Sequence, residues 1–316
     1  MKLHSRITKS VKLDSRICKS VKFSSRIAKS VKLGSRTIKS VNLDARVVAI
    51  KLHSRITKSV KLDSRTCKSV KLSSRIAKSV KLGSRAIKSV NLDTRVIAIK
   101  IHSRITKSVK LDSRTCKSVK LSSRIAKSVK LGSRAIKSVN LDTRVVAIKI
   151  HSRITKSVNL DSRTCKSVKL SSRIAKSVKL GSRAIKSVNL DTRVVAIKIH
   201  SRITKSVKLD SRTCKSVKLS SRIAKSVKLG SRAIKSVNLD TRVVAIKIHS
   251  RITKSVKLDS RTCKSVKLSS RIAKSVKLGS RAIKSVNLDT RVFAIKLHSR
   301  ITKSVNFIPE QLSVQD

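Results

Sequence analysis

The chain has 316 residues, of which 80 are Lys or Arg and 14 are Asp or Glu, giving a formal net charge of +66 and a pI near 11.7. Charge of this size repels itself in a compact state and attracts polyanions. The apolar residues are mainly Val, Ile, Leu and Ala, with three Phe and no Trp or Tyr, so the aromatic anchors of most globular cores are missing. High charge beside moderate hydrophobicity also places the composition close to that of disordered proteins.

Targeting and membrane signals are absent from this sequence. Its longest apolar runs, such as VVAI, are far shorter than the ~20 residues of a membrane-spanning helix. The stretch MKLHSRITKS has no apolar signal-peptide core, so we expect a cytoplasmic or nuclear protein. Lys and Arg never stand side by side, and a dense basic import cluster is therefore missing.

One unit is repeated along almost the whole chain. Residues 51–99 read KLHSRITKSV KLDSRTCKSV KLSSRIAKSV KLGSRAIKSV NLDTRVIAI, which is four decapeptides followed by a nonapeptide. Residues 1–306 therefore form a single array, and residues 307–316 form a divergent tail with the only Pro and the only Glu. The six full units and the partial seventh span 2–50, 51–99, 100–148, 149–197, 198–246, 247–295 and 296–306.

The third position of each decapeptide varies while its neighbours stay constant. Its residue types are mostly turn formers, each followed by Ser or Thr, and this chemistry predicts a turn at every such position. In the second unit the position holds His53, Asp63, Ser73, Gly83 and Asp93.

The segments between these predicted turns alternate as half-buried strands do. Apolar residues fall on odd numbers and basic residues on even numbers, with Lys19 as an exception; examples are Leu13, Ile17, Val21 and Phe23 against Lys12, Arg16 and Lys22. The Val, Ile and Thr content favours strands. Basic amphipathic helices and a largely disordered chain remain the alternatives, although Ser, Val and Thr are mediocre helix formers.

An all-β repeat array of the β-solenoid type satisfies this pattern best. In a meander of hairpins, each strand would turn its basic face toward the apolar face of its neighbour. A coil that always bends the same way keeps one parity inward. Lys68, Lys78 and Lys88 would then point inward unless they lie at corners, because buried ladders of Lys are not credible.

Each repeat ends with the nonapeptide, which is one residue shorter than a decapeptide. It contains the most apolar run of the repeat, VVAI or VIAI. A one-residue slip exchanges the faces of a strand, so the deletion is expected at a corner or bulge. This lysine-free segment is also the expected site of any self-association.

Catalytic and metal-binding patterns are weak. The six Cys recur every 49 residues without CxxC spacing, in a position that Ala77 and Ile87 fill in neighbouring decapeptides, so we expect buried apolar fillers. The seven His share a variable position with Asp, Ser and Gly, without further ligands at metal-site spacing. Identical copies offer no unique cleft, so the sequence predicts a non-enzymatic protein without a cofactor or a metal.

The remaining feature is a regular lattice of cations. In extended structure, three to four residues span ~10–13 Å, a spacing suited to phosphates along a nucleic-acid strand. Base readout needs a docked helix or stacking aromatics, so we expect non-specific binding of nucleic acid or another polyanion. One example set of binding residues is Arg65, Lys68, Lys71, Arg75, Lys78, Lys81, Arg85 and Lys88.

Two other hypotheses come from the near-identity of the copies. A translated satellite-like repeat with no evolved function would show the same uniformity. A structural protein whose β units stack and polymerise is the second.

Overall fold

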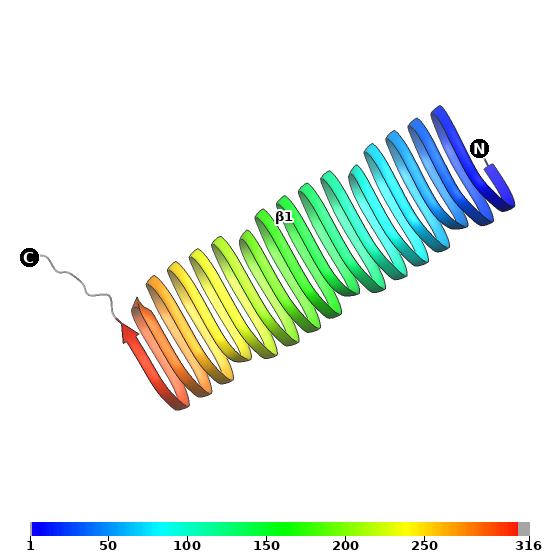
Figure 1. The fold of residues 1–316 in the computed structure, drawn as a ribbon. Coiled ribbons are helices and arrows are strands. Elements are labelled where there is room, and N and C mark those ends of the chain that lie inside the picture. Colours follow the sequence, from blue (N-terminus) through cyan, green and yellow to red (C-terminus); the bar gives the residue numbers. More distant parts are fainter. Residues whose placement is uncertain (1, 309–316) are drawn as a thin grey trace, which may run out of the picture. The chain divides into compact units, whose positions relative to one another are not determined.

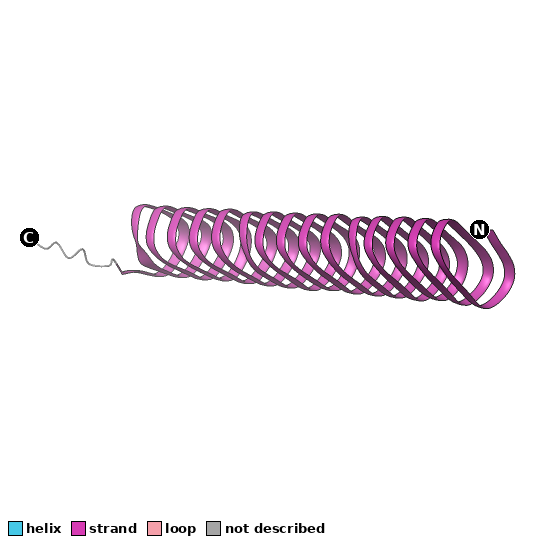
Figure 2. Cartoon of the chain, turned by 90° about the horizontal axis from the view of Figure 1, so that it is seen from above, coloured by secondary structure: helices cyan, strands magenta, loops and turns pink. Residues whose placement is uncertain are grey.

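The computed structural model describes residues 2–308 as one continuous strand, β1 (Lys2–Ile308), and contains no helix in that range. The strand winds in stacked coils (Figure 1, Figure 2), which confirms the predicted β-solenoid. No helix of the described chain is long and apolar enough to cross a membrane. Most of the divergent tail, residues 309–316, lies outside the described range. The structure does not describe the side chains at 45, 47–48, 96–97, 145–146, 194–195, 243–244, 290, 292–293 and 307–308.

The chain divides into two compact units, Met1–Arg163 and Thr164–Asp316. Each unit is a stack of coils of the same construction. The repeat boundaries do not coincide with this division, because residue 163 lies inside the repeat that spans 149–197.

One coil contains about twenty residues, or two decapeptides. Ser64 Oγ donates a hydrogen bond to Ser84 Oγ at 3.2 Å, twenty residues further on, and Ser113 and Ser133 make the same contact. Ser89 Oγ donates to the carbonyl oxygen of Lys68 at 3.2 Å, again in the preceding coil. Equivalent residues of alternate decapeptides therefore stack in register, as in a parallel sheet.

The inward residues of a decapeptide are its second, fourth, seventh and tenth. In residues 71–80 these are Leu72, Ser74, Ala77 and Val80, all buried, whereas the basic residues are exposed. Successive inward residues are two positions apart in one part of the decapeptide and three positions apart in the other. Strict alternation holds from the tenth position to the fourth of the next decapeptide, here named the face segment. The fifth to ninth positions, here named the edge segment, place two outward residues on each side of one inward residue.

This division corrects two predictions. The variable third position is not a turn, because His53, Asp63 and Gly83 lie in extended strand and no described Gly or other residue has a positive φ. Strict parity from Leu13 is also wrong at Ile17, whose side chain is 75% exposed. The alternation changes phase in the edge segment, where two consecutive residues face outward.

The phase change also places the lysines that strict parity would bury. Lys68, Lys78 and Lys88 are all exposed, because each follows the inward seventh residue of its decapeptide. The requirement that these lysines lie at corners is therefore met by the edge segment.

The core is almost entirely aliphatic. Leu92 and Ile99 have no exposed surface, and the second position of most decapeptides holds buried Leu or Ile, with Phe23 in one coil. Some inward hydroxyls find partners within the coils: Ser54 Oγ and Thr57 Oγ1 lie 2.6 Å apart, and Ser84 Oγ donates to the carbonyl oxygen of Ala86 at 3.1 Å. These hydrogen bonds make small polar side chains tolerable inside the coil. Other inward hydroxyls, such as Ser74 Oγ and Thr94 Oγ1, are buried without a hydrogen-bond partner.

The nonapeptide loses its residue in the edge segment, as expected for a corner. Leu92 and Thr94 are buried before the deletion, and Ile99 and Ile101 are buried after it, so both face segments keep their phase. Of the VIAI run, Ala98 is half-buried and Ile99 packs inside the coil. The side chains of residues 96–97 lie outside the described set, and self-association through this run stays a prediction.

Because five short peptides make one repeat and two make one coil, a repeat occupies about two and a half coils. Within each compact unit, successive repeats therefore begin on opposite sides of the coils, and a given residue returns to the same side only after two repeats. This relation decides which side chains become neighbours at the surface.

Replacing Leu92 by Ala should destabilise the coil around residues 81–100. The buried leucine leaves a cavity, and such changes cost about 2–5 kcal/mol. The matched control is Ile76→Ala, because Ile76 is 44% exposed and lies outside the core. Hydrogen exchange followed by mass spectrometry should show faster exchange of 81–100 in Leu92→Ala only. Equal effects of the two substitutions would contradict the inward assignment.

Candidate polyanion-binding surface

Every decapeptide and nonapeptide of the array carries Arg at its fifth position, at the start of the edge segment. Since equivalent residues stack at the spacing of neighbouring strands, these Arg form columns with one side chain per ~4.8 Å. In the first unit one column follows Arg75 and the other follows Arg85, and all of the Arg named here are exposed. The Arg75 column contains Arg16, Arg36, Arg55, Arg75, Arg95, Arg114, Arg134 and Arg153, and the Arg85 column contains Arg6, Arg26, Arg46, Arg65, Arg85, Arg104, Arg124, Arg144 and Arg163.

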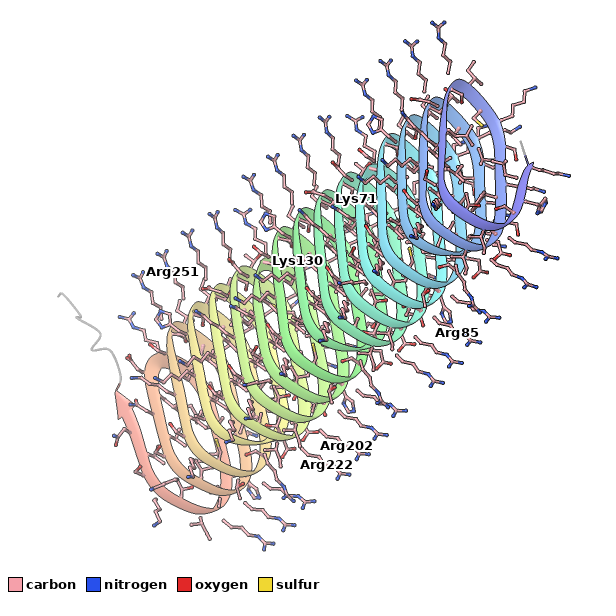
Figure 3. All side chains as sticks on the ribbon, turned by 45° about the vertical axis from the view of Figure 1, so that its right-hand side comes forward. Lys71, Arg85, Lys130, Arg202, Arg222 and Arg251 are labelled. Atoms are coloured by element: carbon pink, nitrogen blue, oxygen red, sulfur yellow. The ribbon has the colours of Figure 1, made fainter. Side chains whose placement is uncertain are left out.

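The two columns project in opposite directions. In the second unit, Arg202 and Arg222 extend from one edge of the coils and Arg251 extends from the opposite edge (Figure 3). In the first unit, Lys71 and Lys130 start from the face between the edges (Figure 3). The Lys of the first and eighth positions are replaced in the nonapeptide, for example by Asn91 and Ala98. The Arg columns are thus the cation columns that continue through every coil.

A shallow groove runs beside each Arg column of the first unit and beside one Arg column of the second. In the first unit one groove of about 1030 Å³ lies along Arg75, Arg95, Arg114 and their neighbours, and a second of about 1020 Å³ lies along Arg26, Arg46 and the rest of the opposite column. The second unit contains a groove of about 1340 Å³ along the column of Arg202 and Arg222. Each groove crosses several coils, so an extended ligand would lie along the axis of the unit.

The variable third position forms the other wall of these grooves. Along the Arg75 column it contributes Asp93, Asp112, Gly132 and His151 in successive coils. A Cβ on Gly132 would lie 3.2 Å from Oδ1 of Asp112, so the glycine makes room for the carboxylate of the preceding coil. Gly83 and Asp63 repeat this contact, also at 3.2 Å, on the other edge. At Gly83 and Gly132 the residue type of the variable position is therefore explained by stacking between coils.

Acidic charge is concentrated by the same stacking. The Asp of a nonapeptide and the Asp of the second decapeptide in the next repeat fall in adjacent coils, as Asp93 and Asp112 do. The following three coils carry Gly, His and Ser beside their Arg. Each edge therefore alternates between two coils with a carboxylate and three coils without one, and the latter are the more cationic part of the groove.

The structure separates the eight predicted binding residues into two sets. Arg65, Lys68, Lys81, Arg85 and Lys88 belong to decapeptides that stack on each other, whereas Lys71, Arg75 and Lys78 lie on the other half of the coil. All eight are exposed. Sequence reasoning placed them in one consecutive set and missed the Asp, Gly and His that line the grooves. The signal that could have found them is the spacing of 19 or 20 residues between alternate Arg.

The cysteines lie away from this surface. Cys67 is 3% exposed, and its Sγ donates a hydrogen bond to the carbonyl oxygen of Ser69 at 3.5 Å. Burial raises the pKa of the Cys67 thiol from 9.0 to about 11, because the thiolate would lose its hydration. Burial raises the pKa of four further thiols to about 11: Cys116, Cys165, Cys214 and Cys263. The described residues contain no group of three or more His, Cys, Asp or Glu that could hold a metal ion.

Comparison with protein-family models, curated proteins and solved structures finds no match for this chain.

Thiol reactivity should separate Cys18 from the other five cysteines. Cys18 is only half-buried, in the first coil, whereas a buried thiol of pKa about 11 is ionised to roughly one part in a thousand at pH 8. At pH 8, a chromogenic disulfide reagent should modify one thiol, that of Cys18, in a fast phase and the other five thiols slowly. Cys18→Ser should remove the fast phase, and denaturant should make the remaining thiols fast. Equal rates for all six cysteines in the native chain would contradict the buried positions.

Proposed function

We propose that this chain is a non-enzymatic scaffold that binds nucleic acid and other polyanions without sequence specificity. The observation that carries this proposal is the pair of exposed Arg columns in the first unit, each continuous from coil to coil and each beside a groove. A guanidinium presents a planar set of donors that matches a phosphate, and its charge does not vary with pH in the physiological range.

Charge density supports a nucleic-acid partner. The repeat 100–148 contains thirteen Lys and Arg and two Asp, a net charge of +11. Two and a half coils at the strand spacing rise about 12 Å, which gives roughly one net positive charge per 1.1 Å. Duplex DNA carries one negative charge per ~1.7 Å of its axis. Summed over all sides, the coils therefore carry more charge per length than a duplex does, and counterion release would favour binding.

The lack of sequence preference follows from what the surface offers. The described chain has no helix to place in a major groove, and the whole sequence has only three aromatic residues, so bases have almost no stacking partners. One coil presents nearly the same contacts as the next. Contacts to phosphates position a protein on nucleic acid but carry no sequence information.

The groove geometry also favours binding over catalysis. Each groove extends over several coils, and its Asp and His recur in successive copies with the same surroundings. A catalytic site would need a single set of groups held in one geometry. Repeated, open and equivalent positions fit a lattice of binding contacts.

The purified chain should bind unrelated DNA and RNA sequences with similar affinity. Contact with one Arg column over five coils engages about five phosphates, so the logarithm of the binding constant should fall against that of the salt concentration with a slope of about −4 or steeper. Filter binding at several salt concentrations measures both quantities. A preference of more than ~100-fold for one sequence, about 2.7 kcal/mol, would contradict the proposal, as would binding that ignores salt.

A further inference from the structure

We propose that each unit of the solenoid bridges two nucleic-acid duplexes, one along each Arg edge. This inference rests on the proposed function and extends it, because a protein with a single cationic side would bind nucleic acid without joining two molecules.

The coil register places Arg on both edges of each coil. A decapeptide is half a coil, so the Arg of consecutive decapeptides leave the coil in opposite directions, and those of alternate decapeptides share an edge. Figure 3 shows this arrangement in the second unit, where Arg251 projects away from Arg202 and Arg222. In the first unit, grooves follow both columns, one along Arg75 and Arg95 and the other along Arg65 and Arg85. In the first unit both edges therefore carry an Arg column and a groove, and in the second unit both edges carry an Arg column and the Arg202 edge carries a groove.

The distance between the edges is the second argument. The face segment that separates them has five extended residues, which span about 16 Å. The Debye length at physiological ionic strength is about 8 Å, so a duplex along one edge does not screen the charges of the other. The second edge keeps its attraction for phosphate after the first is occupied.

Charge balance is the third argument. One duplex supplies a negative charge per ~1.7 Å, against about one net positive charge per 1.1 Å of the coils. A single duplex therefore carries only about two-thirds of the charge needed to balance the whole unit, and the edge that it does not touch keeps its positive charge. This remaining charge repels itself along the unit, and a second duplex on the free edge relieves that repulsion.

Capture of one duplex by another tests the bridge with the full-length chain. A biotinylated 40-base-pair duplex is immobilised on beads, and an unrelated fluorescent duplex of the same length is added with the protein. Wild type should retain the fluorescent duplex on the beads in a protein-dependent manner. A wild type that binds each duplex in filter assays but retains no fluorescence would overturn the bridge and leave the proposed function intact. Failure to bind either duplex would overturn both.

Column variants show whether the bridge uses the two edges. One variant replaces every Arg of the Arg75 column in the first unit and of the Arg251 column in the second by Gln. A second column variant replaces every Arg of the Arg75 column in the first unit and of the Arg202 column in the second unit by Gln. A mixed variant has the same number of Arg→Gln changes as the first, taken alternately from both columns of each unit, so its net charge matches. Circular dichroism should show the same β spectrum for all three, because the replaced side chains are exposed.

We expect at least one column variant to retain about tenfold less fluorescent duplex than the mixed variant, while binding a single duplex within about threefold of it. The Arg75 edge of the first unit can be paired with either edge of the second unit, and the two column variants test both pairings. Equal retention by all three variants would mean that total charge, and not its placement on two edges, joins the duplexes. That result would overturn the inference.

Discussion

The stacking of each residue on the residue about twenty positions later is the constraint on which this structure depends. Hydrogen bonds between coils, such as that from Ser64 to Ser84, hold this register. The register sorts side chains into an aliphatic interior and an outer lattice of cations. It also makes a decapeptide half a coil, which turns a simple repeat into two opposed Arg columns. The nonapeptide preserves the register because its missing residue falls where the chain already changes phase, between Thr94 and Ile99.

Two opposing forces act on this fold. The interior buries aliphatic side chains in every coil, including Leu92 and Ile99 with no exposed surface. Outside, the chain carries a net charge of +66, and the Arg of each column lie ~4.8 Å apart, well within the Debye length. A bound polyanion would relieve this repulsion without altering the core. If the proposed polyanion binding occurs, it would be coupled to folding through charge, and we expect the coils to be most ordered when phosphate groups occupy the edges.

Much of the architecture could be predicted from the sequence, because the features that specify it are local. The strand-forming composition and the alternation in VKLDS or VKLSS indicate a coil with one face inward. The buried position of the Cys could be predicted because Ala77 and Ile87 fill the equivalent position in neighbouring decapeptides. The exposed position of Lys78 could be predicted because burying its amine would cost free energy. The phase change at Arg–Ile could not be read from parity, and so Ile17 was misplaced. The grooves depend on contacts twenty residues apart, such as that of Asp63 with Gly83, which a reading of adjacent residues does not reveal.

Disulfide formation between introduced cysteines tests the coil register most directly. Arg55 and Arg75 are twenty residues apart on one edge, whereas Arg55 and Arg65 lie on opposite edges. Stacked Cα atoms at about 4.8 Å are within the range that a disulfide accepts, and opposite edges are not. After mild oxidation and mass spectrometry under non-reducing conditions, the account predicts an intramolecular disulfide in Arg55→Cys/Arg75→Cys and none in Arg55→Cys/Arg65→Cys. A disulfide in the second variant and none in the first would contradict the twenty-residue coil and the Arg columns built on it.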